Sequence, residues 1–79
     1  MKHNNDKKSY QDLYLNYLAE KEISVTIFLV SGFQIRGTIN ASDNFTVVIH
    51  SEGKQNMVYK HAISTIVPSK PVPVKELFI

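Results

Sequence analysis

The residues best suited to chemistry lie together in one run near the end of the chain, Tyr59-Lys60-His61-Ala62-Ile63-Ser64-Thr65. An aromatic ring, an ammonium group and an imidazole are adjacent there, between two apolar segments. A tyrosine ring can stack on a base, a lysine can pair with a phosphate, and an imidazole can bond a base edge or a hydroxyl. The run therefore favours nucleotide binding, although a Lys60-His61 pair in a turn is also typical of a solvated corner.

Enzyme chemistry has little support in the sequence. Catalysis needs converging groups such as a nucleophile beside a base, and none of the usual nucleophile, phosphate-loop, dinucleotide or zinc-protease motifs is found. The acids are dispersed, with Asp43 and Glu52 in separate expected turns. The three histidines, His3, His50 and His61, are too scattered to indicate a metal site. We expect a binding protein that needs neither metal nor cofactor.

Two other groups of side chains could bind a nucleotide. Phe28 falls on the outward side of the first expected strand, near Gln34 and Arg36 on the second. Exposed phenylalanines are often without function, but one beside a guanidinium and an amide can also form a base-stacking platform. Phe45 follows Asn44 after a turn. The alternation of apolar residues alone favours a place in the core for Phe45 over a role in a binding site.

A helix is expected at the start of the ordered chain. Ser9 can cap it, and Asp12 lies three residues later as a weak capping box. An apolar stripe at helical spacing follows, which we interpret as core packing because so short a helix must lie on another element. The residues of this stripe are Tyr10, Leu13, Tyr14, Tyr17 and Leu18.

From Ile23 the hydrophobic period changes to two, which predicts strands separated by short turns. Gly37, inside the second strand, suggests a sharp bend or a bulge. A helix followed by short strands of this spacing predicts a mainly β fold, a small bent antiparallel barrel. The expected strands are five, over residues 23–30, 33–39, 45–50, 55–59 and 62–67.

The chain of 79 residues is expected to form one small domain. Residues 1–8 are polar and expected to be disordered, residues 9–67 form the domain, and residues 68–79 form a proline-spaced tail. The apolar end Leu77-Phe78-Ile79 should dock on its own subunit or on a neighbour. Because there is no cysteine and the core is small, oligomerisation is the favoured means of stabilisation.

Charge and hydropathy restrict the partners and the location that the protein can have. The net charge is only +2, so nucleic-acid binding would depend on local patches or on several chains together. The N-terminus does not read as a signal peptide, and no apolar run is long enough to span a membrane. We expect a soluble cytoplasmic protein with no membrane partner.

From Gln11 to Pro68 these segments resemble the Hfq family of bacterial Sm-like RNA chaperones. The most specific match is the full run from Tyr59 to Thr65, which has the spelling of the second signature of the family. The resemblance implies an N-terminal helix on a five-stranded bent Sm-like (SH3-like) barrel, in agreement with the periodicity. The Asn44-Phe45 pair and the turn from Ser51 to Gln55 look more like versions from Gram-positive bacteria than from enteric ones. The further matching segments are Gln11-Asp12, Val25 to Val30 with Gly32-Phe33-Gln34, Arg36-Gly37, Asp43-Asn44-Phe45-Thr46-Val47 and Ser51-Glu52-Gly53-Lys54-Gln55.

The resemblance implies a homohexameric ring closed by strand pairing between neighbouring subunits. Copies of Lys60 and His61 around one pore would then make a strong anion site from a weakly charged chain. Such a ring would bind single-stranded RNA and pair small regulatory RNAs with messengers in post-transcriptional regulation and stress response. The alternative is a structural or protein-interaction ring that uses the Leu77-Phe78-Ile79 tail for docking.

On the helix-bearing, or proximal, face the resemblance implies a site for U-rich RNA. A base would stack on Phe45, Lys60 would bond its carbonyl, and His61 would contact ribose or phosphate near the pore. This implication moves Phe45 from the core to the site. The complete proximal set is Gln11, Asn44, Phe45, Tyr59, Lys60 and His61.

On the opposite, or distal, face the resemblance implies a site for A-rich RNA. Asn56 stands where a glutamine is usual, so its amide has a shorter reach. Arg36 favours a purine-then-linker repeat over a three-part repeat. The complete distal set is Phe28, Gly32, Phe33, Gln34, Ile35, Arg36, Asn56 and Thr65.

The outer rim departs from members that carry an arginine cluster at the end of the helix. Here that stretch is Ala19-Glu20-Lys21-Glu22, so acids replace most of the cations. Asn16 matches and Lys21 is the remaining cation of the rim set. We therefore expect weak annealing of two RNAs at the rim.

Overall fold

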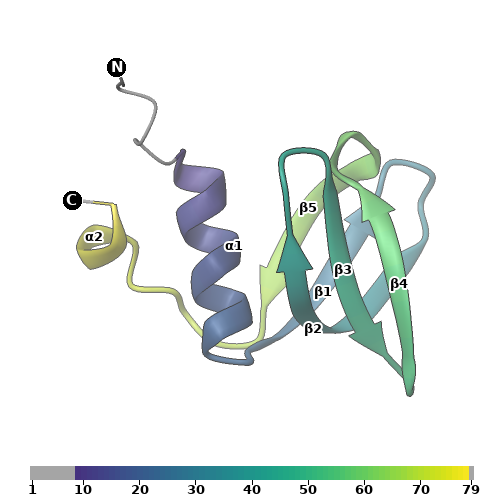
Figure 1. The fold of residues 1–79 in the computed structure, drawn as a ribbon, viewed down its shortest axis with the longest axis horizontal. Coiled ribbons are helices and arrows are strands. Elements are labelled where there is room, and N and C mark those ends of the chain that lie inside the picture. Colours follow the sequence, from purple (N-terminus) through teal and green to yellow (C-terminus); the bar gives the residue numbers. More distant parts are fainter. Residues whose placement is uncertain (1–8, 79) are drawn as a thin grey trace.

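The computed structural model describes residues 9–78 and contains a helix followed by five strands, as the periodicity predicts (Figure 1). The predicted disorder of residues 1–8 lies outside the described residues. A short 3-10 turn, η2, replaces the expected tight link before the last strand. The elements are α1 (Tyr10–Glu20), β1 (Ser24–Leu29), β2 (Gln34–Ser42), β3 (Thr46–Ser51), β4 (Lys54–Tyr59), η2 (Lys60–Ala62), β5 (Ile63–Pro68) and α2 (Val74–Leu77).

The strands form one antiparallel sheet in the order β4-β3-β2-β1-β5. The sheet is bent, as expected, but within the described residues it does not close, because β4 and β5 are not paired with each other. Turn η2 joins them directly and carries the chain from one edge of the sheet to the other. The expected barrel is therefore an open, curved sheet with one free edge on β4 and one on β5.

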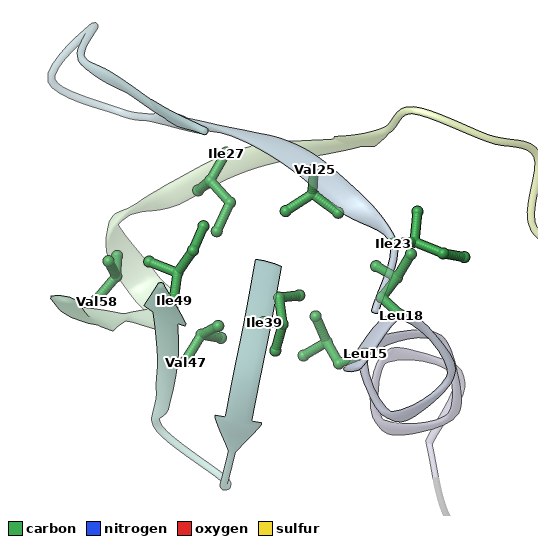
Figure 2. Close-up of a cluster of buried hydrophobic side chains, with 9 residues drawn as sticks. All are labelled: Leu15, Leu18, Ile23, Val25, Ile27, Ile39, Val47, Ile49 and Val58. Carbon is green, nitrogen blue, oxygen red and sulfur yellow. The ribbon is translucent and has the colours of Figure 1, made fainter. Parts of the chain in front are cut away.

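The core lies inside the curve of the sheet, and Leu15 and Leu18 of α1 cover it on one side (Figure 2). The alternation predicted for the strands is confirmed, since Val25 and Ile27 of β1 are buried, as are Val47 and Ile49 of β3. The complete buried core is Leu15, Leu18, Ile23, Val25, Ile27, Ile39, Val47, Ile49 and Val58.

The buried face of α1 differs from the predicted stripe. Leu15 and Leu18 are its buried residues, and Leu15 was not in the stripe. Tyr10, which was in it, is 67% exposed, whereas Tyr14 and Tyr17 pack partly against the core. The helix meets the sheet through its second half, so the buried face centres on Leu15 and Leu18.

Both ends of α1 are capped. The Ser9 hydroxyl accepts a hydrogen bond from the Asp12 N–H at 3.1 Å, which confirms the predicted N-cap. At the other end Glu22 adopts a left-handed φ of 53°. Ile23 N–H donates to Leu18 O, and Glu22 N–H donates to Ala19 O, both at 3.1 Å. This is the Schellman pattern, in which glycine is the usual residue at the position of Glu22.

Gly37 and the bulge of β2 are separate features. A Cβ at Gly37 would overlap the backbone carbonyl oxygen of His50, so β3 passes too close to β2 for any side chain. The register shift falls later, between Ile39 and Ala41. The sequence therefore predicted the irregular strand, but glycine is needed for a close backbone approach and not for the bulge itself.

The tail returns to α1 after β5. Phe78 stacks on Tyr10 with ring centroids 4.5 Å apart and planes 12° apart, and Val72 packs against the core. The described part of the tail thus docks on its own subunit, while Ile79 lies outside the described residues. Neither α1 nor α2 is long and apolar enough to cross a membrane.

Candidate nucleic-acid interface

The bend between β2 and β3 presents Phe45 to solvent. The Asp43 Oδ1 atom accepts hydrogen bonds from the N–H groups of Phe45 at 2.9 Å and Thr46 at 2.8 Å, and from the Thr46 hydroxyl at 2.8 Å. Because β3 begins only at Thr46, Phe45 lies outside the alternating pattern and is 73% exposed. The prediction from alternation that Phe45 is in the core is therefore wrong. Asn44 is exposed in the same bend.

The hydrogen bonds to Asp43 also stabilise its charge. The N–H of Phe45 has the largest effect, followed by the hydroxyl and N–H of Thr46, and together they hold the pKa of Asp43 below its ordinary value of 3.8. The positive charge of Lys60 adds a smaller effect in the same direction. Asp43 is therefore an ionised anchor for the bend.

Lys60 connects this bend to helix α1. Its backbone N–H donates to Phe45 O at 2.7 Å, so the start of η2 is fixed to the bend. Its Nζ lies 3.9 Å from the Asp12 carboxylate, and its side chain is only 12% exposed. The side chain of Lys60 thus lies against α1, and the solvated-corner interpretation does not describe it.

Tyr59 and His61 lie on either side of Lys60. Their rings stack with centroids 5.7 Å apart and planes 18° apart, and both residues are exposed. They present a flat aromatic surface of the kind on which bases can stack.

A hollow of about 290 Å³ lies between α1 and β5 and is lined by Gln11 and Lys60 from the proximal set. Asn44, Phe45, Tyr59 and His61 do not line it. Within one chain the proximal set is therefore divided, with Phe45 linked to Lys60 through the backbone and Gln11 close to Lys60 across this hollow.

Members of the distal set form a row across three strands. Phe28 of β1 lies opposite Gln34 of β2 on one side and Thr65 of β5 on the other. Directly opposite residues of antiparallel strands project on the same face, so these three side chains are neighbours. Gly32, with a φ of 102°, and Phe33, 74% exposed, form the turn beside this row.

The remaining distal residues surround a second hollow, of about 450 Å³. Ile35 lies opposite the buried Ile27, which puts it on the core side of β2, and it is half-buried there. Arg36 follows on the other side of the strand, and Asn56 comes from β4. The structure thus brings Gln34, Ile35, Arg36 and Asn56 together.

The rim residues lie on α1 and at its end. Asn16 is exposed. The Lys21 Nζ lies 5.9 Å from the centroid of the Tyr17 ring, a cation–π distance. Glu20 and Glu22 are exposed beside it, and the last turn of α1 has no basic residue.

Sequence reasoning missed two positioning residues in this region. Asp12 was interpreted only as part of a cap, and Asp43 only as a turn residue, although each contacts or attracts Lys60. The aspartate two residues before Phe45 was a usable signal, because Asp side chains commonly bond the backbone N–H two residues on. Among residues 9–78 no group of His, Asp or Glu is arranged to hold a metal ion.

An N-terminal helix on a bent five-stranded antiparallel sheet, with aromatic and cationic residues at its turns, defines an Sm-like protein. The sequence model of the family described as "Hfq protein" matches residues 10–73. The chain belongs to the Hfq family.

Individual relatives agree with this assignment. The RNA-binding protein Hfq of Brevibacillus brevis is 64% identical over 62 residues, covering 78% of each chain. That of Exiguobacterium sp. is 54% identical over 72 residues, covering 89% of this chain and 88% of the relative. A crystal structure of the pleiotropic translational regulator Hfq aligns with a TM-score of 0.73 at 41% identity, covering 75% of this chain and 98% of that one. The Hfq protein from Anabaena sp. gives a TM-score of 0.70 at 29% identity, covering 77% of this chain and all of the other.

Proposed function

We propose that this protein is an RNA chaperone that binds single-stranded RNA in post-transcriptional regulation in the cytoplasm. The observation that carries the proposal is the exposed Phe45, held outward by Asp43 and joined through its backbone to the cation Lys60. A solvent-facing ring whose backbone is bonded to that of a fixed cation suits a stacked base and its phosphate. Relatives named RNA-binding protein Hfq support the same function.

The proposed protein has two RNA-binding sets. The proximal set takes U-rich RNA through Gln11, Phe45 and Lys60, with Tyr59 and His61 as a second stacking surface. The distal set takes A-rich RNA on the row made by Phe28, Gln34 and Thr65. Both sets belong to the proposed Sm-like domain of residues 9–67.

The proposed assembly is a homohexameric ring. Within the described residues, β4 and β5 each leave one edge of the sheet unpaired. Exposed apolar side chains lie on both edge strands, Met57 on β4 and Val67 on β5. Pairing β4 of one subunit with β5 of the next would satisfy both edges and cover these side chains.

Direct titration tests the proposed function. Fluorescence anisotropy of labelled oligo-U and oligo-A should show tight binding of both, while native mass spectrometry measures the assembly. Copurified nucleic acid that disappears on nuclease treatment would support the same conclusion. A nuclease-treated protein that binds neither oligonucleotide would overturn it. The alternative of a protein-docking tail gains no support, because Phe78 is stacked on Tyr10 of its own chain.

A further inference from the structure

The hollow of about 450 Å³ extends beyond the distal set to the β3–β4 hairpin. Its volume is in the range of roughly 300–1,000 Å³ typical of ligand sites. The half-buried Ile35 lines it on the core side of the sheet. The polar residues around it are Gln34, Arg36 and Asn56 from the distal set and Ser51, Glu52 and Lys54 from the hairpin.

The hairpin residues are held at this hollow by the fold. The absence of a side chain at Gly37 lets the end of β3 approach β2 closely, which brings Ser51 and Glu52 beside Arg36. The turn itself has left-handed φ angles of 52° at Glu52 and 78° at Gly53, the signature of a tight two-residue hairpin. Ser51 pairs with Lys54 at the last position of the β3–β4 ladder, so Lys54 has a defined place.

The charged groups around this hollow have no ion-pair partner in the described part of the chain. Over residues 9–78 the ion pair within 4.0 Å is that between Lys60 and Asp12, and it does not involve the hollow. Arg36, Glu52 and Lys54 are all exposed. Two cations and one carboxylate therefore face the same space, together with the amides of Gln34 and Asn56.

This combination selects a class of ligand. A simple anion would pair with the cations but would be repelled by Glu52, whereas an isolated base would leave the cations without partners. A ribonucleotide chain carries both a phosphate and a hydroxyl donor. The ribose 2′-hydroxyl is the group by which a site distinguishes RNA from DNA.

Building on the proposed binding of A-rich RNA, we propose that this hollow holds the sugar–phosphate backbone of that strand. Lys54 and Arg36 pair with a phosphate, and Glu52 accepts a hydrogen bond from the neighbouring 2′-hydroxyl. The hairpin is thus a specificity element that makes the distal set prefer RNA over DNA of the same sequence.

The phosphate pairing is tested by the salt dependence of oligo-A binding. Removing the cation that neutralises one phosphate should reduce the slope of log affinity against log salt by about 0.7 for a single strand. Lys54→Ala should therefore lower the slope by at least about 0.7, and Lys70→Ala, which removes an exposed cation outside the hollow, serves as the matched control. If Lys54→Ala and the unmodified protein show the same salt slope for oligo-A, the proposal is overturned. It is also overturned if Lys54→Ala lowers the salt slope for oligo-U as much as the slope for oligo-A.

The hydroxyl interaction is tested by comparing ribo- and deoxyribo-oligo-A of one length. Glu52→Gln replaces the charged acceptor with a neutral one and so weakens the hydrogen bond, and the preference for RNA should fall by about fivefold. Glu76→Gln, which changes an exposed residue of α2 outside the hollow, is the control. If Glu52 acts only by repulsion, both oligonucleotides gain equally and the ratio stays constant, which overturns the inference while the proposed function stands. A protein that binds no oligo-A at all would overturn both.

Discussion

The Phe45 N–H donates a hydrogen bond of 2.9 Å to the Asp43 carboxylate, so the orientation of an exposed ring depends on a charge two residues earlier. An aromatic side chain at the surface binds a base more tightly if it is ordered before the base arrives, because less conformational entropy is lost on binding. Asp43 supplies this order through three hydrogen bonds to the bend. We therefore treat Asp43 as a positioning residue for the proximal set.

Asp43→Ala should weaken oligo-U binding several-fold and leave oligo-A binding close to its original value. Asp43→Asn keeps an oxygen that can accept the same backbone bonds, so its effect should be smaller. Anisotropy titrations of both variants measure the effect. Equal weakening by the two substitutions would show that the charge, rather than the geometry, is what matters.

The stability of the bend should depend on acidity. Since the pKa of Asp43 is lowered in the folded chain, its contribution is complete above the ordinary value of 3.8 and is lost as the pH falls through the folded pKa. The melting temperature of Asp43→Asn should therefore lie below that of the unmodified protein at pH 7, and the difference should close only as the pH falls below 3.8 and through the lowered pKa of Asp43. A gap that does not change with pH would contradict this account.

Glu22→Gly should stabilise the chain. Glu22 has a φ of 53° in a Schellman C-cap, and a left-handed conformation costs a residue with a Cβ about 1–2 kcal/mol. After the entropy that glycine gains on unfolding, a net increase of up to about 1 kcal/mol is expected. Chemical denaturation measures it, and Glu22→Ala is the control for loss of charge. If the alanine variant gains as much, the effect is electrostatic and the strain argument fails.

The weak annealing that we expect at the rim should be increased by substitution. Ala19 packs against the core, so Glu20, which is exposed, is the better position for a new cation. Glu20→Arg should speed the annealing of two complementary RNAs, because cations reduce the repulsion between phosphate backbones. Stopped-flow measurements should show a gain that shrinks at high salt. Fast annealing by the unmodified protein that Glu20→Arg does not change would place this activity elsewhere.

Much of the fold could be predicted from the sequence because its determinants are local. The N-cap at Ser9 and the alternation of Val25 with Ile27 depend on neighbouring residues alone. The role of Leu15 was missed because the buried face of a helix depends on where the sheet meets it. The open sheet was missed for a similar reason, since alternation does not determine whether β4 pairs with β5.

The candidate site was predictable only in part. Alternation misplaced Phe45 because the strand starts one residue later, and the resemblance to a family with an exposed ring corrected this. The hollow beside Lys54 could not be predicted, because it forms where Gly37 lets two strands approach and brings Glu52 close to Arg36. Juxtapositions of this kind arise from tertiary structure and leave no short pattern in the sequence.

The central claim is that one chain carries two separate RNA-binding sets, and a reciprocal titration tests it most directly. Phe45→Ala and Phe28→Ala are each titrated with oligo-U and oligo-A, with assembly checked by native mass spectrometry. Loss of a stacking ring costs about 1–3 kcal/mol, or roughly 5- to 150-fold in affinity. We predict that Phe45→Ala loses oligo-U binding and keeps oligo-A, and that Phe28→Ala, like Arg36→Ala, does the reverse. Equal weakening of both oligonucleotides by each variant would contradict the account.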